Sequence, residues 1–279
     1  MKTLITGASG NIGSYICKAL KDKGFDIIPT DCRQADNQAL PVMKLNLLDT
    51  EATEKAIQNV DTVIHLGNHS YSGHPQTIFN ENCAMNMNVF QAAATSGVKK
   101  IIFASSIQVL ASEGSGTVLK TEKPDFPEFP LDSSTPANTR NSYALSKTTG
   151  ENMLSYFASL YPIEGIAVRF PTMIPPHHMK MGKQPAKIGL TWIRQAFAAL
   201  TFPDTTNFLE CVLNTNLPGF RIYLPASRCQ RASLSLEDIV ERYYSHIPWN
   251  PDKPTDRLID ISRLKEEIGW EPEDEAEFY

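Results

Sequence analysis

A tyrosine and a lysine stand four residues apart in the segment Tyr143-Ala144-Leu145-Ser146-Lys147. Residues at this spacing lie on one face of a helix, so the two side chains are expected to be neighbours. A phenol with its ordinary pKa of about 10 is a poor base at neutral pH, and an adjacent ammonium favours the phenolate. The spacing therefore predicts that Tyr143 transfers a proton and that Lys147 stabilises its anionic form.

Two serines, Ser105 and Ser106, follow the apolar run of residues 100–104. This run is continuous and contains β-branched residues, which is typical of a buried parallel strand. Ligands of open α/β sheets bind at the carboxyl ends of the strands. We therefore predict that Ser106 hydrogen-bonds the reacting oxygen of a substrate and acts with Tyr143 and Lys147. The alternative is a serine that only caps the end of the strand.

A glycine pattern lies between the first strand-like segment and the first helical segment. The spacing of Gly7, Gly10 and Gly13 suits a tight turn, a close approach to a pyrophosphate and close packing of helix on strand. The N-terminus of the helix then offers N–H groups to the phosphates. Asp31 ends the second predicted strand, where a carboxylate binds the adenosine ribose, so NAD is the expected cofactor. The alternatives are a turn that serves packing alone and, because Arg33 is near, NADP.

Short strand-like runs alternate with helical patterns up to about residue 170. This alternation predicts an α/β fold with a Rossmann-type doubly wound parallel sheet. Residues 1–170 are expected to form an NAD-binding domain, and residues 171–279 a small C-terminal α/β substrate lobe, parts of which return to the sheet. The proline-rich residues 112–140 predict a long functional loop. Expected strands are 2–5, 25–30, 42–45, 62–66, 100–104, 165–170 and 221–224. Expected helices are one that follows the glycine pattern and runs through residue 20, and 50–59, 76–96, 142–160, 188–200, 206–214, 235–246 and 262–268.

The composition excludes several classes of protein. Of the 279 residues, 42% are apolar and 20% are charged, and the net charge is −5. An acidic chain of this kind is not expected to bind nucleic acid, and no apolar run approaches the roughly 20 residues of a membrane span. We expect no metal, because metal-ligand spacing is absent from the five scattered cysteines and from the pair His177-His178. We expect the cysteines to be reduced and the protein to be cytoplasmic.

Together, these motifs resemble the extended short-chain dehydrogenase/reductase family, the NAD-dependent epimerase/dehydratases. The resemblance extends over nearly the whole chain. It implies an NAD-dependent oxidoreductase of carbohydrate metabolism in which a hydride moves to or from the nicotinamide. It also implies a homodimer formed by the helices near 80–96 and 142–160. The residues that carry it are Thr6–Gly13, Asp31, Val63–Leu66, Asn82, Ser106, Tyr143, Lys147 and Ile268–Pro272.

The resemblance also implies further contacts to the cofactor. Asn46 and Leu47 are expected to flank the adenine, and Leu66 and Gly67 to line the cofactor. The backbone around Pro171 and Thr172 is expected to meet the nicotinamide. The full predicted set is Gly7, Ser9, Gly10, Asn11, Ile12, Gly13, Asp31, Asn46, Leu47, Leu66, Gly67, Tyr143, Lys147, Pro171 and Thr172.

Within the family, the chain is most similar to uronate dehydrogenases, which oxidise a free hexuronic acid at C1. The likeness lies in His65-Leu66-Gly67, in Phe103–Ser106 and in Leu264–Phe278. It departs from them at Ile107-Gln108, where they carry Asn-His. Their carboxylate-binding arginine falls near Met181, beside Lys180.

The function predicted from this resemblance is oxidation of a hydroxyl group of a sugar or sugar acid. The residues expected to contact the substrate are Ser70, Ser106, Gln108 and Tyr143, with Tyr71, His69, His177, His178 and Lys180 near the same sheet edge. Nucleotide-sugar members carry asparagine where this chain has Thr172, which weakens the case for such a substrate. The alternatives are a nucleotide-sugar epimerase or dehydratase that retains NAD, and a non-catalytic NAD-sensing protein.

Overall fold

The computed structural model describes residues 1–33, 40–69, 73–110, 124–178, 190–231, 235–254, 256–273 and 275–278. The chain divides into two compact units that alternate along the sequence. Unit 1 consists of Met1–Ser105, Ser142–Val168 and Val212–Ile222. Unit 2 consists of Ser106–Asn141, Arg169–Cys211 and Tyr223–Tyr279.

Unit 1 is built on a seven-stranded sheet with the order β3-β2-β1-β4-β5-β6-β9. The pairs from β3 through β5 are all parallel. The chain proceeds outward from β1 to β3 and then returns to β4 on the other side of β1, so the strand order reverses there. The predicted Rossmann-type doubly wound sheet is confirmed. Its strands are β1 (Lys2–Thr6), β2 (Asp26–Asp31), β3 (Met43–Lys44), β4 (Thr62–His65), β5 (Lys100–Ser106), β6 (Glu164–Phe170) and β9 (Phe220–Tyr223), the last residues of β5, β6 and β9 being assigned to unit 2.

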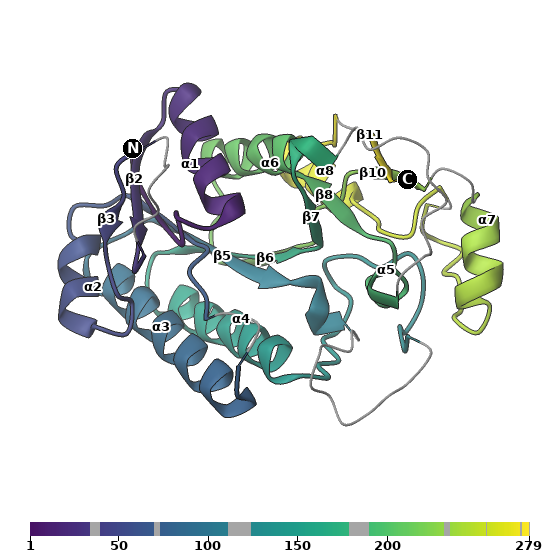
Figure 1. The fold of residues 1–279 in the computed structure, drawn as a ribbon, viewed down its shortest axis with the longest axis horizontal. Coiled ribbons are helices and arrows are strands. Elements are labelled where there is room, and N and C mark those ends of the chain that lie inside the picture. Colours follow the sequence, from purple (N-terminus) through teal and green to yellow (C-terminus); the bar gives the residue numbers. More distant parts are fainter. Residues whose placement is uncertain are drawn as a thin grey trace. The chain divides into compact units, whose positions relative to one another are not determined.

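The helices of unit 1 supply its core. The helices α3 and α4 lie side by side (Figure 1). Phe90 of α3 packs edge-on against Phe103 of β5, with ring centroids 5.5 Å apart, and also contacts Phe157 of α4. Each buried aromatic side chain stabilises the fold by about 2 kcal/mol, so this cluster fixes the helices against the sheet. The helices are α1 (Asn11–Asp22), α2 (Thr50–Ile57), α3 (Pro75–Thr95) and α4 (Ser142–Leu160).

A buried lysine holds the start of β5. The Nζ atom of Lys100 donates to the carbonyl oxygens of Val212 at 2.6 Å and Thr215 at 2.7 Å. These carbonyls end helix α6 (Phe202–Asn214). Lys100 also pairs with Glu164 at 3.2 Å. A cation is favourable beside carbonyl oxygens at the C-terminal end of a helix, so Lys100 fixes the segment that begins at Val212 within unit 1.

Unit 2 contains two small parallel pairs of strands, β7 with β8 and β10 with β11. Among the helices that the structure describes, none combines the length and apolar character needed to cross a membrane. The strands are β7 (Thr172–Ile174), β8 (Ala199–Thr201), β10 (Arg228–Arg231) and β11 (Glu275–Phe278), and the helices are α5 (Leu190–Arg194), α7 (Leu236–Ile239), a π-helical turn (Val240–Tyr244) and α8 (Ser262–Ile268).

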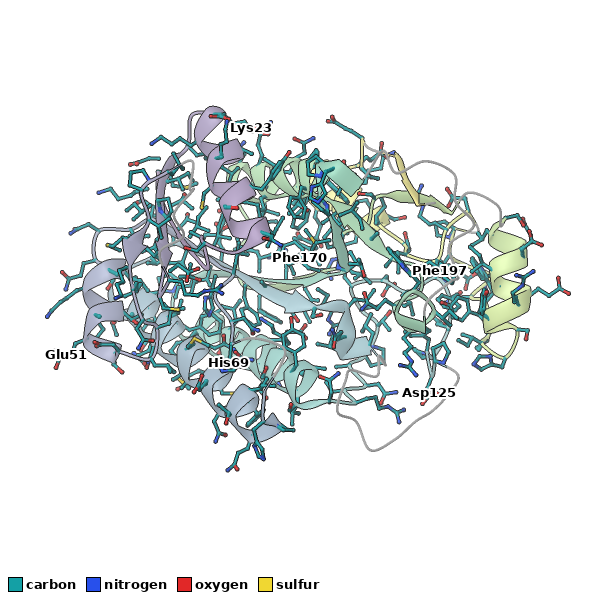
Figure 2. The ribbon with its side chains drawn as sticks, viewed as in Figure 1. Lys23, Glu51, His69, Asp125, Phe170 and Phe197 are labelled. Atoms are coloured by element: carbon teal, nitrogen blue, oxygen red, sulfur yellow. The ribbon has the colours of Figure 1, made fainter. Side chains whose placement is uncertain are left out.

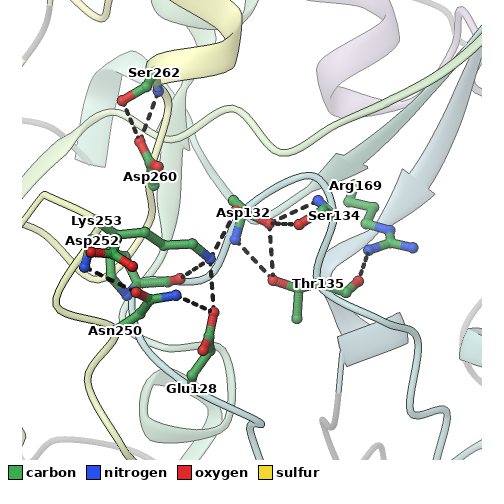
Figure 3. Close-up of polar contacts among 11 residues, drawn as sticks. Glu128, Asp132, Ser134, Thr135, Arg169, Asn250, Asp252, Lys253, Asp260 and Ser262 are labelled. Carbon is green, nitrogen blue, oxygen red and sulfur yellow. Dashed lines mark hydrogen bonds and ion pairs between the residues drawn. The ribbon is translucent and has the colours of Figure 1, made fainter.

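Lys253 ties the segment before α4 to the C-terminal part of unit 2 (Figure 3). Its Nζ atom lies 3.1 Å from Glu128 Oε1 and 2.9 Å from Asp132 Oδ2. Nearby, a nitrogen of Arg169 donates to the carbonyl oxygen of Thr135 at 2.6 Å. These contacts fix residues 128–135, which lie within the predicted long loop.

The helix predicted near 188–200 is wrong in its second half. Helix α5 ends at Arg194, and both Ala196 and Phe197 adopt positive φ angles, 51° and 53°. Residues Ala199–Thr201 then form β8, which pairs with β7. This partner strand lies far away in the sequence, so local periodicity does not reveal it. Phe197 is buried.

Candidate active site

The loop after β1 requires glycine because it meets other backbone segments closely. Gly7 adopts a φ of +72°, which side chains rarely allow. A Cβ atom on Gly13 would lie 2.2 Å from the oxygen of Gly7, and one on Gly7 would lie 2.9 Å from the nitrogen of Gly67. The ends of β1 and β4 therefore touch where the strand order reverses. Dinucleotides bind at this point of doubly wound sheets.

The N-terminus of α1 faces this loop with its amide groups. The helix begins at Asn11, and Gly10 before it supplies no side-chain acceptor. The first N–H groups of a helix, here including those of Asn11 and Ile12, have no acceptor within it. Gly10 itself donates to the oxygen of Gly7 at 3.1 Å. The glycine loop and the helix end thus fit a pyrophosphate.

Asp31 ends β2 with a buried carboxylate. It accepts the N–H groups of Ser9 at 3.0 Å and of Arg33 at 2.9 Å, one on each oxygen. The Cys32 side chain also hydrogen-bonds this carboxylate, whose two oxygens together offer about four acceptor positions, so the carboxylate can still accept from a ribose hydroxyl. The exposed guanidinium of Arg33 lies 3.8 Å from Asp31 and faces its charge. The Asp31 carboxylate would repel a phosphate on the adenosine ribose, so a ribose without a phosphate, as in NAD, fits better.

The segment after β3 reaches the same edge of unit 1. The carbonyl oxygen of Leu47 accepts a hydrogen bond from Asn88 at 2.9 Å. The Leu47 side chain is buried, and a Cβ atom on Gly67 would lie 2.7 Å from its Cδ1. Asn46 is exposed, and its side chain accepts the N–H of Leu48 at 3.1 Å. Leu47 and Gly67 are therefore neighbours, whereas Asn46 faces solvent.

A buried series of hydrogen bonds lies beneath these loops. The N–H of Gly67 donates to Thr6 Oγ1 at 2.9 Å, and this oxygen lies 2.7 Å from His65 Nδ1. On the other side of the ring, His65 Nε2 lies 3.0 Å from Asn86 Oδ1. Burial, and then the charge of Lys147, lower the pKa of His65 to about 3. The imidazole is therefore neutral at neutral pH.

Tyr143 and Lys147 lie one turn apart at the start of α4, as their spacing predicts. The Nζ atom of Lys147 is 5.5 Å from the centroid of the Tyr143 ring and 5.1 Å from that of Phe103. Only 3% of Lys147 is exposed, and this burial lowers its pKa to about 7. One turn further, a Cβ atom on Gly150 would lie 2.5 Å from the Phe103 ring. Glycine at this position lets α4 approach β5, and the lysine beside the tyrosine exchanges its proton near neutral pH.

Asn82 links the loop after β4 to the first turn of α4. Its Oδ1 atom accepts the N–H of His69 at 2.7 Å, and its Nδ2 atom donates to Ser146 Oγ at 3.1 Å. Ser146 Oγ donates in turn to the carbonyl oxygen of Tyr143 at 2.8 Å. The side chain of His69, labelled in Figure 2, lies 3.3 Å from Glu81. Asn82 therefore holds Tyr143 through the backbone.

The two serines at the end of β5 have different partners. Ser105 donates to the buried Glu151 at 2.6 Å, within unit 1. Ser106, the first residue of unit 2, accepts the N–H of Gln108 at 3.2 Å. Its hydroxyl proton therefore remains available for another oxygen. The Oε1 atom of Gln108 accepts from Asn141 at 3.3 Å.

The remaining predicted residues belong to unit 2 or to residues that are not described. Pro171 is buried, and Thr172 in β7 donates to Gln195 at 2.7 Å. His177 is exposed in the short turn Pro176–His178. Outside the described residues lie Ser70, Tyr71, Lys180 and Met181.

Two curated relatives are similar over most of the chain. A uronate dehydrogenase of Pseudomonas putida is 29% identical over 230 residues, which are 81% of this chain and 76% of that protein. A GDP-mannose 3,5-epimerase of Oryza sativa subsp. indica is 24% identical over 312 residues, covering 98% of this chain and 78% of the other.

Solved structures share the fold. A uronate dehydrogenase from Agrobacterium tumefaciens has a TM-score of 0.69 at 20% identity, with 99% of this chain and 85% of the other covered. A GalE-like L-threonine dehydrogenase from Cupriavidus necator has a TM-score of 0.72 at 20% identity, with 98% and 96% covered.

The family itself is identified by a match over residues 3–211 to the NAD dependent epimerase/dehydratase family. The matched region contains the glycine loop, Asp31, Ser106, Tyr143 and Lys147. It spans well over half of the chain. This chain belongs to the NAD-dependent epimerase/dehydratase family and is an NAD-dependent enzyme of the extended short-chain dehydrogenase/reductase type.

Proposed function

We propose that this enzyme is a dehydrogenase that oxidises a hydroxyl group of a free sugar acid, with Ser106, Tyr143 and Lys147 as its catalytic residues. The observation that carries the proposal is the buried Lys147, with a pKa of about 7, one helical turn from Tyr143. The similarity to uronate dehydrogenases of two Pseudomonas species supports a uronic acid as substrate.

In the proposed reaction the substrate loses a proton from its hydroxyl oxygen and a hydride from the carbon that bears it. When NAD is bound, it accepts the hydride. The phenolate oxygen of Tyr143 receives the proton, and the Lys147 ammonium stabilises the phenolate before the transfer. Ser106 donates a hydrogen bond from its hydroxyl to the substrate oxygen, keeps its own proton and orients that oxygen.

Recognition of the substrate is assigned to Ser70 and Gln108 in addition to Ser106 and Tyr143. The contact between Gln108 Oε1 and Asn141 supports this assignment, because it leaves the Gln108 amide nitrogen to donate to a substrate oxygen. Residues 1–170 would then bind NAD, and residues 171–279 would complete the substrate site.

The reaction is tested by the formation of NADH at saturating NAD with free uronic acids, neutral aldoses and UDP-sugars. We expect NADH from glucuronate or galacturonate and none from the UDP-sugars. No NADH from any free sugar, together with an altered stereochemistry of a nucleotide sugar, would overturn the proposal. That outcome would favour an epimerase, a reading supported by the 98% coverage of this chain by the GDP-mannose 3,5-epimerase.

We also propose that the enzyme is a homodimer formed by α3 and α4. Leu145, Tyr156 and Leu160 lie on one face of α4 by helical spacing, and they are 46%, 58% and 59% exposed. Met87 of α3 is also 42% exposed. Exposed apolar side chains along one face of a helix favour an interaction surface there.

Light scattering after gel filtration should give twice the 31.0 kDa mass of the chain. The substitution Leu160→Glu should give a folded monomer, because it introduces a charge into the interface. Leu48→Glu, at a residue that is 41% exposed outside α3 and α4, is the matched control and should remain a dimer. A monomeric wild type, or a dimeric Leu160→Glu variant, would contradict this interface.

A further inference from the structure

His65 connects the two loops of the cofactor site to helix α3. It is the last residue of β4, and it is completely buried. The rings of Phe90 and Phe103 flank the imidazole, each with its centroid 5.9 Å away. Both ring nitrogens have polar partners, Thr6 on one side and Asn86 on the other. A buried polar side chain with two satisfied nitrogens is held in a single orientation.

The partners determine which nitrogen carries the proton. The N–H of Gly67 donates to Thr6 Oγ1, so the hydroxyl proton of Thr6 points elsewhere. The Oδ1 atom of Asn86 only accepts, so His65 Nε2 must be the protonated nitrogen. Nδ1 is then the acceptor for the Thr6 hydroxyl. The donors run in one direction, from Gly67 through Thr6 and His65 to Asn86.

The contact between Thr6 and Gly67 lies where the loops after β1 and β4 meet. A Cβ atom on Gly67 would lie 3.0 Å from Thr6 Oγ1, and one on Gly7 would lie 2.9 Å from the nitrogen of Gly67. The two loops therefore have no spare room between them. A small rotation of the Thr6 side chain would release the Gly67 amide and shift one loop against the other.

We propose that His65 is a positioning residue for NAD, which holds the Thr6 hydroxyl so that its oxygen receives the Gly67 amide and fixes the two loops that enclose the dinucleotide. The proposal rests on the NAD dependence of the family and is independent of the substrate. Of the two hydrogen bonds of His65, the one from Nδ1 to Thr6 serves NAD binding. The one from Nε2 to Asn86 only supports the ring.

Two substitutions at His65 test these two hydrogen bonds separately. The side-chain amide of asparagine takes the position of Nδ1, where its oxygen accepts from Thr6, but it does not reach Asn86. The amide of glutamine takes the position of Nε2 and leaves Thr6 without its acceptor. We expect His65→Asn to bind NAD within about threefold of the wild type, and His65→Gln to bind about tenfold more weakly, the effect of one lost hydrogen bond.

Thr6→Val tests the same contact without changing the histidine. Valine keeps the shape of threonine and removes the hydroxyl, so NAD binding should weaken about tenfold, as in His65→Gln. Thr3→Val is the matched control on the same strand. Thr3 is also completely buried, and its hydroxyl has no partner among the described residues. Its replacement should leave the Kd of NAD unchanged.

The measurement is the Kd of NAD by isothermal titration calorimetry without substrate, on variants whose circular dichroism matches that of the wild type. A failure of the proposed sugar-acid reaction does not affect this result. The proposal is overturned if Thr6→Val binds NAD as tightly as Thr3→Val. It is also overturned if His65→Asn and His65→Gln bind NAD equally well. If His65→Gln does not fold, the pair of threonine variants decides.

Discussion

Replacing Tyr143 with phenylalanine should lower kcat by about a thousandfold, the usual contribution of a positioned proton-transfer group. The ring remains beside Lys147, whose Nζ atom lies 5.5 Å from its centroid, and only the hydroxyl is lost. The Kd of NAD should therefore change by less than about threefold. Stopped-flow NADH formation measures the first quantity and calorimetry the second.

Tyr156→Phe is the control for this substitution. It removes the hydroxyl of a tyrosine on the same helix that is 58% exposed, and it should leave kcat unchanged. A Tyr143→Phe variant that keeps more than about a tenth of the activity would exclude Tyr143 as the group that transfers the proton. A wild-type protein that binds NAD and turns over no substrate would instead favour the NAD-sensing alternative.

The sheet of unit 1 was predictable because its signals are local. Each glycine of the loop after β1 meets a requirement set by its immediate neighbours, a turn or a close backbone contact. The strands are short apolar runs that separate helical patterns, and right-handed crossovers leave few arrangements for them. The spacing of Tyr143 and Lys147 likewise specifies one face of one helix.

The short strands of unit 2 were not predictable in this way. Strands β7 and β8 have three residues each, and they pair with each other although a long segment of sequence separates them. The positive φ angles of Ala196 and Phe197 interrupt a stretch whose apolar pattern favours a helix. Both features depend on contacts between distant residues, which periodicity does not record.

The polar network beneath the candidate site was not predicted, for a related reason. Thr6, His65 and Asn86 come from three different elements, and no spacing links them. One signal was available: Asn82 and Asn86 stand four residues apart on the face of α3 that is otherwise buried and apolar. Buried amides need partners, so this pair indicated a polar network below the catalytic helix.

Replacing Lys147 with methionine should lower kcat/KM at pH 7 by about a thousandfold. The adjacent ammonium and phenol titrate as a pair, and burial brings the pKa of Lys147 to about 7. Oxidation requires the deprotonated base, and the neighbouring ammonium favours the phenolate, so the wild-type rate should rise with pH and level off below the ordinary tyrosine pKa of about 10. Without the ammonium the phenol has its ordinary pKa of about 10, so the rise of kcat/KM should move toward that pH. Each pH unit of this shift lowers kcat/KM about tenfold at a fixed lower pH. A pH profile of kcat/KM from pH 6 to 10 measures the shift.

Lys99→Met, which removes an exposed charge, is the control and should reproduce the wild-type profile. A Lys147→Met profile that rises at the same pH as the wild-type profile would show that the lysine does not assist the tyrosine. If Lys147 had only a structural role, its replacement would also be expected to destabilise the protein.

The stability of the same variant separates these roles. Because the pKa of Lys147 is lowered from 10.5 to about 7 in the folded protein, the unfolded chain binds more protons between those values. The free energy of unfolding of the wild type should therefore fall as the pH falls through this window, by up to about 1.4 kcal/mol per unit. Methionine fills the buried space without a charge, so Lys147→Met should be the more stable protein at pH 7 and should lose this advantage by about pH 10.5. Urea unfolding at both pH values measures it. A variant that gains stability while losing activity identifies a lysine retained for catalysis, because packing alone would favour its replacement.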